Sequence, residues 1–261
     1  MEIEQLKSEK EKLVFVLKGV TSEFANALRR SIYEVPILAI DEVEISRNDS
    51  ALYDEMIAHR LGLVPLRTDK KTFTEKEECS CKGKGCAKCT ASLVLKAKGP
   101  CTVYSGDLKS KVVEAAYPEM PIVTLQEGQE LEMVANARLG KAKDHVKWSS
   151  GLIWFRAYPK IEIPKECDSC KECADVCPKK VFEFDKKLII KNLNECDLCE
   201  ACADECKKQG KNAIKISQSN EDFIFYVESF GQISPKEMVL EALDVIEKNM
   251  NILSKEVNKL K

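Results

Sequence analysis

The sequence predicts an α+β fold in which a strand-rich middle and a cysteine-bearing segment lie between strand–helix units at the two ends of the chain. Residues 12–36 and 223–260 each show a β-branched and aromatic run followed by an apolar pattern of helical period. Residues 91–163 consist mostly of short β-type runs separated by Gly, Pro and Asp. With 261 residues, the chain is long enough for one or two domains of roughly 100–200 residues each.

The first strand–helix unit begins with the run KLVFVLKG at residues 12–19, which is typical of a strand. Thr21 or Ser22 can cap the helix that follows, and Pro36 ends it. The apolar face of this helix is formed by residues spaced four apart, Phe24, Leu28 and Ile32. A second strand is then expected at residues 37–46.

The middle of the chain opens with a second helix, which Ser50 is expected to cap and Gly62 to end. The runs SLVLKAKG, CTVYSG, QELEMVANA and LIWFRAYPKIEI follow, separated by turn residues, and each is typical of a short strand. Cys101 lies alone in the second of these runs, and we expect it to be a small buried apolar side chain.

The last segment has the most regular pattern in the sequence, and Ser234 and Pro235 form a typical start of a helix. Apolar residues, spaced alternately four and three apart, follow at Val239, Leu243, Ile246, Met250, Leu253, Val257 and Leu260. A helix of about 24 residues would span ~36 Å, more than a short strand at residues 223–229 can cover. We therefore expect part of this seam to pack on that strand and the remainder to pack on a partner chain.

Composition excludes several classes of protein. Hydrophobic residues make up 44% of the chain and charged residues 32%, as expected of a folded protein rather than a disordered one. The formal net charge of −2 disfavours independent nucleic-acid binding, which would require a basic surplus. No apolar run approaches the ~20 residues of a membrane span, and the polar residues 1–12 do not resemble a signal peptide. We therefore expect a cytoplasmic protein without membrane attachment.

The 13 cysteines, all between Cys79 and Cys206, indicate metal chemistry rather than disulfides, because the count is odd and no secretory signal is present. Eight of them form two runs with the spacing C-x2-C-x2-C-x3-C, the pattern of two-cluster bacterial ferredoxins. By this resemblance, cluster one would be bound by Cys167, Cys170, Cys173 and Cys206, and cluster two by Cys177, Cys196, Cys199 and Cys202. Two [4Fe-4S] clusters are therefore expected, with zinc or a degenerate segment without metal as the alternatives.

A third group of cysteines, in a loop that also holds Gly83 and Gly85, consists of Cys79, Cys81, Cys86 and Cys89. Four thiolates so close in sequence can enclose one tetrahedral Zn2+, and the glycines permit the tight turn. A zinc site is therefore expected here, with disulfides in an oxidised preparation or a loop without metal as the alternatives.

No catalytic site can be recognised in the sequence. The two histidines, His59 and His145, lack metalloprotease spacing, and each is expected to have a packing or interface role. The sequence holds no P-loop, no G-x-S-x-G motif and no cluster of aspartates suited to polymerase magnesium chemistry. The chain is therefore expected to have no active site of its own.

Four stretches resemble the alpha-type assembly subunits of cellular RNA polymerases, and more closely the archaeal D-type group, some members of which carry a ferredoxin-like domain. The stretches are EFANALRRSIYEVPILAI (residues 23–40), DEMIAHRLGLVPLRTD (54–69), HVKWSS (145–150) and FIFYVESFGQISPKEMVLEAL (223–243). The resemblance covers nearly the whole chain.

The resemblance implies a discontinuous, alpha-like dimerisation domain at residues 1–47 and 212–261, an inserted mixed β-rich domain at 48–164 and a ferredoxin-like iron–sulfur domain at 165–211. It also implies pairing with a smaller alpha-like partner, subunit L, to form the platform for the two large catalytic subunits. The partner interface would include Phe24, Leu28, Arg29, Arg30, Ile32, Val239, Leu243, Ile246, Met250 and Leu253, with Arg60 and Arg67 near other subunit contacts. The loop at 79–89 would correspond to the zinc loop of eukaryotic relatives.

Two functions are compatible with these patterns. The first is a non-catalytic assembly subunit of DNA-directed RNA polymerase, in which the clusters have a structural or redox-sensing role. The second is an electron-transferring, ferredoxin-type subunit of an anaerobic oxidoreductase. The second function would leave the two terminal strand–helix units without an explanation.

Overall fold

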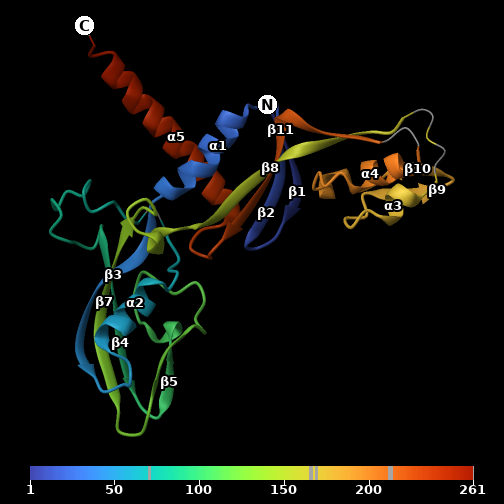
Figure 1. Cartoon of the computed structure of the whole chain (residues 1–261). Coiled ribbons are helices and arrows are strands. Elements are labelled where there is room, and N and C mark those ends of the chain that lie inside the picture. The colour runs from blue at the N-terminus through green and yellow to red at the C-terminus, as the bar shows by residue number, and fades with distance from the viewer. Residues whose placement is uncertain (70–71, 165–166, 168–169, 211–213, 261) are drawn as a thin grey trace. The chain divides into compact units, whose positions relative to one another are not determined.

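The computed structural model describes residues 1–69, 72–164, 167, 170–210 and 214–260 (Figure 1). The chain divides into two compact units, each assembled from separate stretches of sequence. The first comprises Met1–Ser8, Val14–Asn26 and Trp154–Tyr226, and the second Glu9–Leu13, Ala27–Ile153 and the stretch from Val227 onward. Among the described residues, no helix has the length and apolar character needed to cross a membrane.

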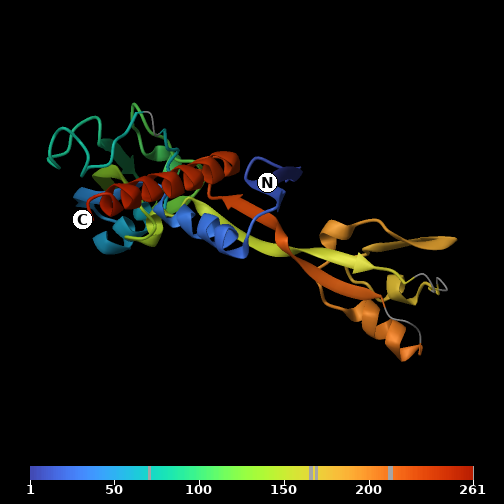
Figure 2. The ribbon, with the colours of Figure 1, turned by 90° about the horizontal axis from the view of Figure 1, so that it is seen from above.

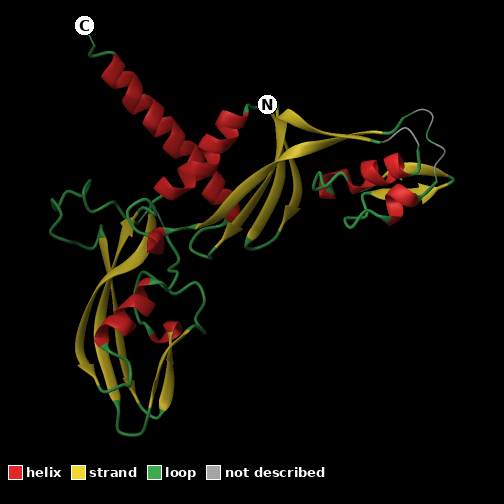
Figure 3. Cartoon of the chain, in the orientation of Figure 1, coloured by secondary structure: helices red, strands yellow, loops and turns green. Residues whose placement is uncertain are grey.

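Strands and helices alternate irregularly along the chain (Figure 3), so the expected mixture of α and β structure is confirmed. The strands are β1 (Glu2–Ser8), β2 (Lys12–Lys18), β3 (Ile37–Asn48), β4 (Thr90–Lys98), β5 (Cys101–Tyr104), β6 (Pro121–Leu125), β7 (Glu130–Gly140), β8 (Gly151–Glu162), β9 (Phe182–Asp185), β10 (Lys187–Ile190) and β11 (Lys215–Ser229). The α-helices are α1 (Ser22–Ser31), α2 (Asp54–Gly62), α3 (Glu172–Asp175), α4 (Ala201–Lys208) and α5 (Pro235–Val257), and single 3-10 turns include η1 (Ile32–Glu34) and η4 (Leu193–Glu195).

A four-stranded sheet in the order β1-β2-β11-β8 brings together strands from both ends of the chain. Its buried face is aromatic: the ring of Phe15 stacks on Phe225 at 5.2 Å between centroids, and Phe155 contacts Phe225 at the same distance. The expected strands at residues 12–19 and 223–229 are confirmed, because β2 and β11 cover them. Burial of these aromatic side chains is the main source of stability for the sheet.

Two members of this sheet differ from the sequence-based expectation. β1, an edge strand, was not expected. All of its residues are exposed apart from the partly buried Leu6, so it lacks the apolar alternation by which a strand can be predicted. β8 was assigned to the strand-rich middle but pairs in the four-stranded sheet beside β11. Figure 2 shows β8 and β11 running together toward the cysteine segment. A strand pattern does not specify which neighbour it joins, which is why β8 was misplaced.

The strand-rich middle forms a three-stranded antiparallel sheet in the order β3-β7-β4, accompanied by the β5–β6 hairpin pair and helix α2. β7 alternates strictly, with Leu131, Met133 and Ala135 buried and the intervening residues partly exposed. Helix α2 contributes Ile57 and Leu61, both fully buried, to the same apolar core. This alternation explains why β4 and β7 could be predicted from period alone.

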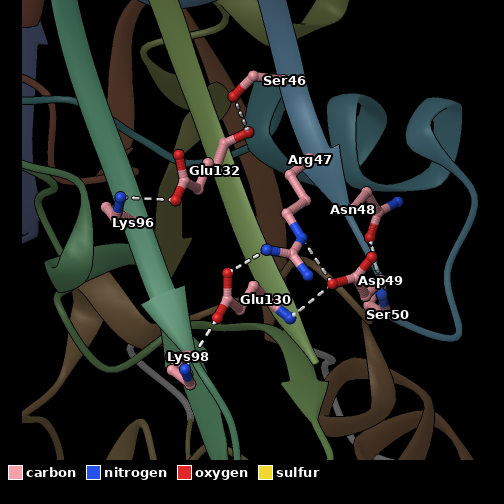
Figure 4. Close-up of polar contacts among 9 residues, drawn as sticks. All are labelled: Ser46, Arg47, Asn48, Asp49, Ser50, Lys96, Lys98, Glu130 and Glu132. Carbon is pink, nitrogen blue, oxygen red and sulfur yellow. Dashed lines mark hydrogen bonds and ion pairs between the residues drawn. The ribbon is translucent and has the colours of Figure 1, made fainter. Parts of the chain in front are cut away.

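The outer surface of this sheet carries a network of ion pairs across all three strands (Figure 4). Glu130 on β7 pairs with Arg47 on β3 and with Lys98 on β4, where the Nζ–Oε1 distance is 3.0 Å. Lys96 pairs with Glu132 at 2.6 Å, and Arg47 also contacts Asp49 at 2.8 Å. Each exposed pair contributes about 0.2–1 kcal/mol at most. The lysines on β4, an edge strand, also discourage pairing with strands of other molecules.

Helix α2 begins later than expected. Its N-cap is Tyr53, whose side chain makes no capping hydrogen bond. The hydroxyl of Ser50 instead donates to Oδ1 of Asn48 at 2.6 Å, and the Asn48 amide donates to the carboxylate of Asp54 at 2.7 Å. Ser50 therefore stabilises the turn before the helix, and the expectation that it caps the helix was wrong. The helix ends at Gly62, as expected.

Helix α5 starts as predicted. Ser234 and Glu237 form a reciprocal capping box, and Pro235 occupies the first turn. The residues that α5 buries are Pro235, Met238 and Ala242, a stripe that lies one position before the predicted seam. Residues 247–260 are exposed throughout. The predicted seam is therefore not the stripe that faces the core. The two stripes lie side by side on the helix and have the same period, so the period alone does not distinguish them.

Candidate metal centres and partner surface

The four cysteines of the 79–89 loop converge on one point. Their sulfur atoms all lie within 4.8 Å of one another. The Sγ–Sγ distance is 3.6 Å for Cys79–Cys86 and for Cys81–Cys89, and 3.9 Å for Cys86–Cys89. A disulfide would require about 2.05 Å, so these pairs are not disulfides. Four sulfurs at Zn–S bonds of about 2.3 Å stand about 3.8 Å apart in a tetrahedron. The donor set and its spacing therefore fit a single Zn2+.

The backbone of the loop explains this convergence. Gly83 and Gly85 adopt φ of +80° and +85°, which side-chain-bearing residues adopt only at a cost. Tight turns follow on each side, since the amide of Lys82 donates to the Cys79 carbonyl at 3.0 Å. Beyond them, the amide of Cys86 donates to the sulfur of Cys89 at 3.3 Å. The loop is thus folded so that its thiols face inward.

One thiol of the loop is shifted toward ionisation. Burial opposes the charged form of Cys81, but hydrogen bonds from the thiols of Cys79 and Cys89 outweigh it and lower the pKa of Cys81 to about 7. Thiolates rather than thiols bind metals. The quartet is therefore prepared to release protons when a cation enters.

A cluster of charges from β3, β7 and the turn at Val146–Trp148 lies beside the loop. Asp41 accepts from Nε of Arg138 at 2.5 Å and from Nζ of Lys147 at 2.6 Å, and Arg138 also lies 3.9 Å from Glu77. Both cations lie over the indole ring of the buried Trp148. Burial tends to raise the pKa of Asp41, but the hydrogen bonds from Lys147 and Arg138 lower it below its ordinary value. The sequence analysis did not find this cluster, whose members are far apart in the chain.

The segment from Cys167 to Cys206 has a different construction, a small core made partly of cysteine. The buried residues of this core are Cys173, Val181, Phe182, Leu188, Cys196, Cys202, Cys206 and Ile214. Helices α3 and α4 contact each other, and β9 and β10 form a hairpin. Half of the fully buried side chains in this core are thus thiols, so few apolar groups hold the segment together.

The pKa of the buried Cys173 responds to cysteines of both runs. Burial is the main cause that raises this pKa to about 12, and the neighbouring charges of Cys206, Cys170, Cys167 and Cys202 contribute to the same rise in decreasing order.

The second set is coupled in the same way. Burial, together with the charges of Cys177 and Cys196, raises the pKa of Cys202 to about 11 against the lowering effect of backbone hydrogen bonds. Burial likewise raises the pKa of Cys196, with contributions from Cys177 and Cys199. Cys206, the fourth cysteine of the second run, is thus close enough to affect Cys173 of the first run, and Cys177, the fourth of the first run, affects Cys196 and Cys202 of the second.

The two runs also share a backbone feature that reflects their repeat. Lys171 and Glu200, each directly after the second cysteine of its run, have φ of +69° and +59° and precede a helix. In addition, the amide of Val181 donates to the sulfur of Cys177 at 3.5 Å. Amide-to-sulfur bonds stabilise the negative charge on metal-bound thiolates. The donor set therefore fits two four-thiolate metal centres.

Cys101 and the two histidines lie outside the cysteine groups. Cys101 is exposed, so the expectation of a buried residue was wrong: β5 is short, and Val103 is its buried residue. His145 caps the turn at Val146–Trp148 by accepting from the amide of Lys147. His59 is exposed on α2. None of these residues forms a catalytic arrangement with another described residue.

The residues predicted to contact a partner fall into three classes of exposure. Leu28 and Ile32 are buried; Phe24, Arg29, Val239 and Ile246 are partly buried; Arg30, Leu243, Met250 and Leu253 are exposed. The exposed apolar side chains on α5 are substantial: Met250 is 60% exposed, Leu253 56% and Val257 52%. We call Leu243, Met250, Leu253 and Val257 the α5 seam. Leu28 and Ile32 support the chain from within and do not face solvent.

Of the two arginines near other expected contacts, Arg60 donates to the Pro121 carbonyl at 2.9 Å and Arg67 pairs with Glu114 at 2.7 Å. Arg156, which the sequence analysis did not single out, is bound to backbone carbonyls of the cysteine segment.

Comparison with known proteins identifies the family. Residues 43–154 match the model of the RNA polymerase Rpb3/RpoA insert domain. The chain is 45% identical over 243 residues to DNA-directed RNA polymerase subunit Rpo3 of Methanothermobacter thermautotrophicus, covering 90% of each chain. It is 37% identical to the Rpo3 subunit of Archaeoglobus fulgidus over 99% of this chain and 98% of the relative.

The Rpo3 subunit of Pyrococcus furiosus is also 37% identical, over 100% of this chain and 98% of the relative. The match therefore includes the cysteine segment and both chain ends as well as the insert. A ferredoxin-type electron carrier is not favoured, since these relatives are polymerase subunits along their full length. The chain belongs to the Rpo3 family, the archaeal alpha-type (D-type) assembly subunits of DNA-directed RNA polymerase.

Proposed function

We propose that this chain pairs through α5 with a smaller alpha-like subunit, subunit L, and that the pair nucleates assembly of the two large catalytic subunits in the cytoplasm. The observation that carries this proposal is the α5 seam. Apolar side chains spaced four and three apart remain exposed over the last turns of a helix whose core stripe is already buried. A seam of this kind is stabilised when a second helix covers it.

The proposal assigns a role to each part of the chain. Residues 1–47 and 212–261 would form most of the dimerisation domain, whose sheet also includes β8, and 48–164 most of the insert that contacts large subunits, whose sheet also includes β3. Residues 165–211 would form a metal-dependent domain. Arg30 would contribute at the rim of the partner interface, and Leu28 and Ile32 would stiffen the helix from beneath. The family membership of the chain supports this division of labour.

Co-expression with subunit L followed by size-exclusion chromatography tests the pairing. We expect a stable heterodimer with the native chain. The double variant M250D/L253D should abolish co-elution, because two carboxylates would be buried without partners in the interface. The matched control N251D/S254D adds the same charge to exposed residues one position away and should retain the partner. Equal behaviour of the two variants would contradict the seam as the contact.

We also propose that the cysteine segment binds two [4Fe-4S] clusters. Cluster one would be held by Cys167, Cys170, Cys173 and Cys206, and cluster two by Cys177, Cys196, Cys199 and Cys202. When bound, the clusters would supply folding energy and a redox-sensitive element, rather than a path for catalytic electron transfer. The crossed electrostatic coupling of the thiols and the cysteine-rich core support this assignment.

The loop quartet, Cys79, Cys81, Cys86 and Cys89, is proposed to bind one Zn2+ as a structural ion. The tetrahedral spacing of its sulfurs supports this choice. A closed site with four protein ligands leaves no position for a substrate, as is typical of structural zinc.

Metal analysis of anaerobically purified protein tests both assignments. We expect ~8 iron atoms per chain, as two four-iron clusters require, and about one zinc atom. C170S should remove about half of the iron and leave zinc unchanged. Binding of subunit L should survive cluster loss, whereas assembly with the large subunits should weaken. Iron near zero together with high zinc would reject the cluster assignment.

A further inference from the structure

A single arginine joins the second cysteine quartet to the four-stranded sheet. Arg156 lies on β8, and its Nη1 and Nη2 donate to the backbone carbonyls of Cys196 and Asn194. Its Nε donates to the phenol oxygen of Tyr226 on β11 at 2.9 Å. The guanidinium also lies over the Tyr226 ring, 5.7 Å from its centroid, and that ring stacks on Trp154 at 5.4 Å.

The carbonyls that Arg156 binds are the open end of a short helix. Cys196 directly follows η4, and the last carbonyls of a helix have no partners within it. The planar guanidinium group of an arginine carries a permanent positive charge and several N–H donors. It suits such an end, because the negative ends of the carbonyl dipoles point outward there. Arg156 therefore satisfies acceptors that the turn itself leaves open.

The other side of the same turn is also fixed. The amides of Lys191 and Asn192 donate to the carbonyl of Val181 at 2.9 and 3.1 Å, and the amide of Val181 donates to the sulfur of Cys177. One continuous set of hydrogen bonds thus runs from Cys177 through Val181 to the turn before Cys196. Arg156 connects that set to β8 and β11.

We propose that Arg156 is the positioning residue of the second metal centre: it fixes the turn that presents Cys196 and so couples retention of that centre to the four-stranded sheet. This inference rests on the proposed cluster assignment. Arg156 binds Cys196 at its backbone carbonyl, so it acts through the backbone of a ligand residue. Its positive charge close to that ligand also favours the more negative, reduced state of a cluster. Both effects concern cluster two and not cluster one.

Iron release to a ferrous chelator from the anaerobically purified full chain tests the inference. Native protein should release its iron slowly. R156M should lose about half of its iron about 10–100-fold faster, as expected when a group that orients a metal ligand is removed. K160M is the matched control, since Lys160 is an exposed cation on the same strand, β8. It should release iron at the native rate.

Double variants assign the effect to one centre. In C199S, which lacks a ligand of cluster two, the remaining iron belongs to cluster one. Adding R156M to C199S should leave its release rate unchanged, whereas adding R156M to C170S should accelerate loss of what remains. Acceleration of equal size in both backgrounds would mean that R156M loosens the whole segment, and would overturn the proposal.

The reduction potential provides a readout that general loosening would not produce. Potentiometric titration followed by electron paramagnetic resonance should show a lower potential for cluster two in R156M and an unchanged potential for cluster one. R156K, which keeps the charge but not the planar fork, should restore the potential more fully than the release rate. If native protein carries ~8 iron atoms and R156M matches it in release and potential, this inference fails while the cluster assignment stands. If native protein carries no iron, the cluster assignment itself fails.

Discussion

The 79–89 loop and the Cys167–Cys206 segment both gather thiols, but they do so in opposite ways. In the loop, four sulfurs approach within 4.8 Å and are surrounded by backbone amides and turns. In the segment, no described set of cysteines is that tight, and the buried thiols lie among apolar side chains. Ligands of one ion must share a single tetrahedron, whereas ligands of a four-iron cluster each bind a different iron and stand farther apart.

This difference indicates what each metal contributes. The loop is attached to an insert with a large apolar core of its own, which includes fully buried Leu93, Leu131 and Ile57. The segment has a core in which cysteines take the place of such residues. The proposed zinc would therefore shape a local loop on a domain that folds without it, whereas the proposed iron would form part of the core of the segment.

The largest expected effect follows directly. Removing iron from the segment should unfold it, because four of the buried side chains would become thiols with no common partner. Hydrogen exchange on metal-loaded and chelator-treated protein should show loss of protection across the described residues 170–210. Protection in β4 and β7 should remain at the native level, which serves as the internal control. Retained protection in α4 after complete iron removal would contradict the inference that iron forms part of the core of the segment.

The next largest expected effect is a difference in stability between core substitutions in the two regions. L93A in the insert should lower the free energy of unfolding by about 2–5 kcal/mol, since it leaves a cavity in a fully buried site. L188A in the iron-loaded segment should cost less, because the proposed metal bonds would contribute more to the fold than this 8% exposed side chain. Anaerobic denaturant titrations with probes in each region measure both. A larger cost for L188A than for L93A would show that apolar packing dominates the segment too.

Local period allowed much of the fold to be predicted. β2, β4, β7 and the start of α5 follow from alternation or capping patterns that lie within a few residues of one another. β1 could not be predicted, because an exposed edge strand has no apolar face. The stripe of Met238 and Ala242 was also missed, since periodicity does not tell which of two adjacent stripes of a helix is buried.

The candidate sites show the same limit. Cysteine spacing was sufficient to predict the loop quartet, because its ligands are local and thiolates are chemically distinctive. It could not reveal Arg156, whose partner Cys196 is 40 residues away and is bound through its backbone rather than its side chain. Nor could it reveal the contact of Asp41 with Lys147, which are 106 residues apart. Such contacts depend on the sheet topology.

A smaller effect is expected from opening the loop quartet. C86S should reduce bound zinc from about one atom to near zero, because a closed structural site needs all four ligands. Exchange should increase only around residues 74–90, and binding of subunit L should be retained. C101S, which changes an exposed cysteine outside the three groups, is the control and should keep its zinc. Unfolding of the whole insert in C86S would contradict a purely local role.

The smallest predicted effect concerns the charges beside the loop. Asp41 has a pKa lowered below its ordinary value of about 3.8, because hydrogen bonds from Lys147 and Arg138 outweigh the opposing effect of burial. Its ionised form therefore stabilises the folded state. That contribution is complete above the pKa of the unfolded chain, about 3.9, and is lost as the pH falls through the lower pKa of the folded state.

D41N should consequently lower the free energy of unfolding of the insert by about 1–2 kcal/mol at pH 7, the difference between hydrogen bonds to a charged acceptor and to a neutral one. The difference between D41N and the native chain should narrow as the pH falls below about 4, where Asp41 itself becomes protonated. Denaturant titrations across this range measure it, with E44Q on the exposed face of β3 as the control. A difference that persists undiminished at low pH would mean that Asp41 acts through packing. The surroundings of the loop would then be stabilised by packing, whereas the proposed metal would stabilise the segment.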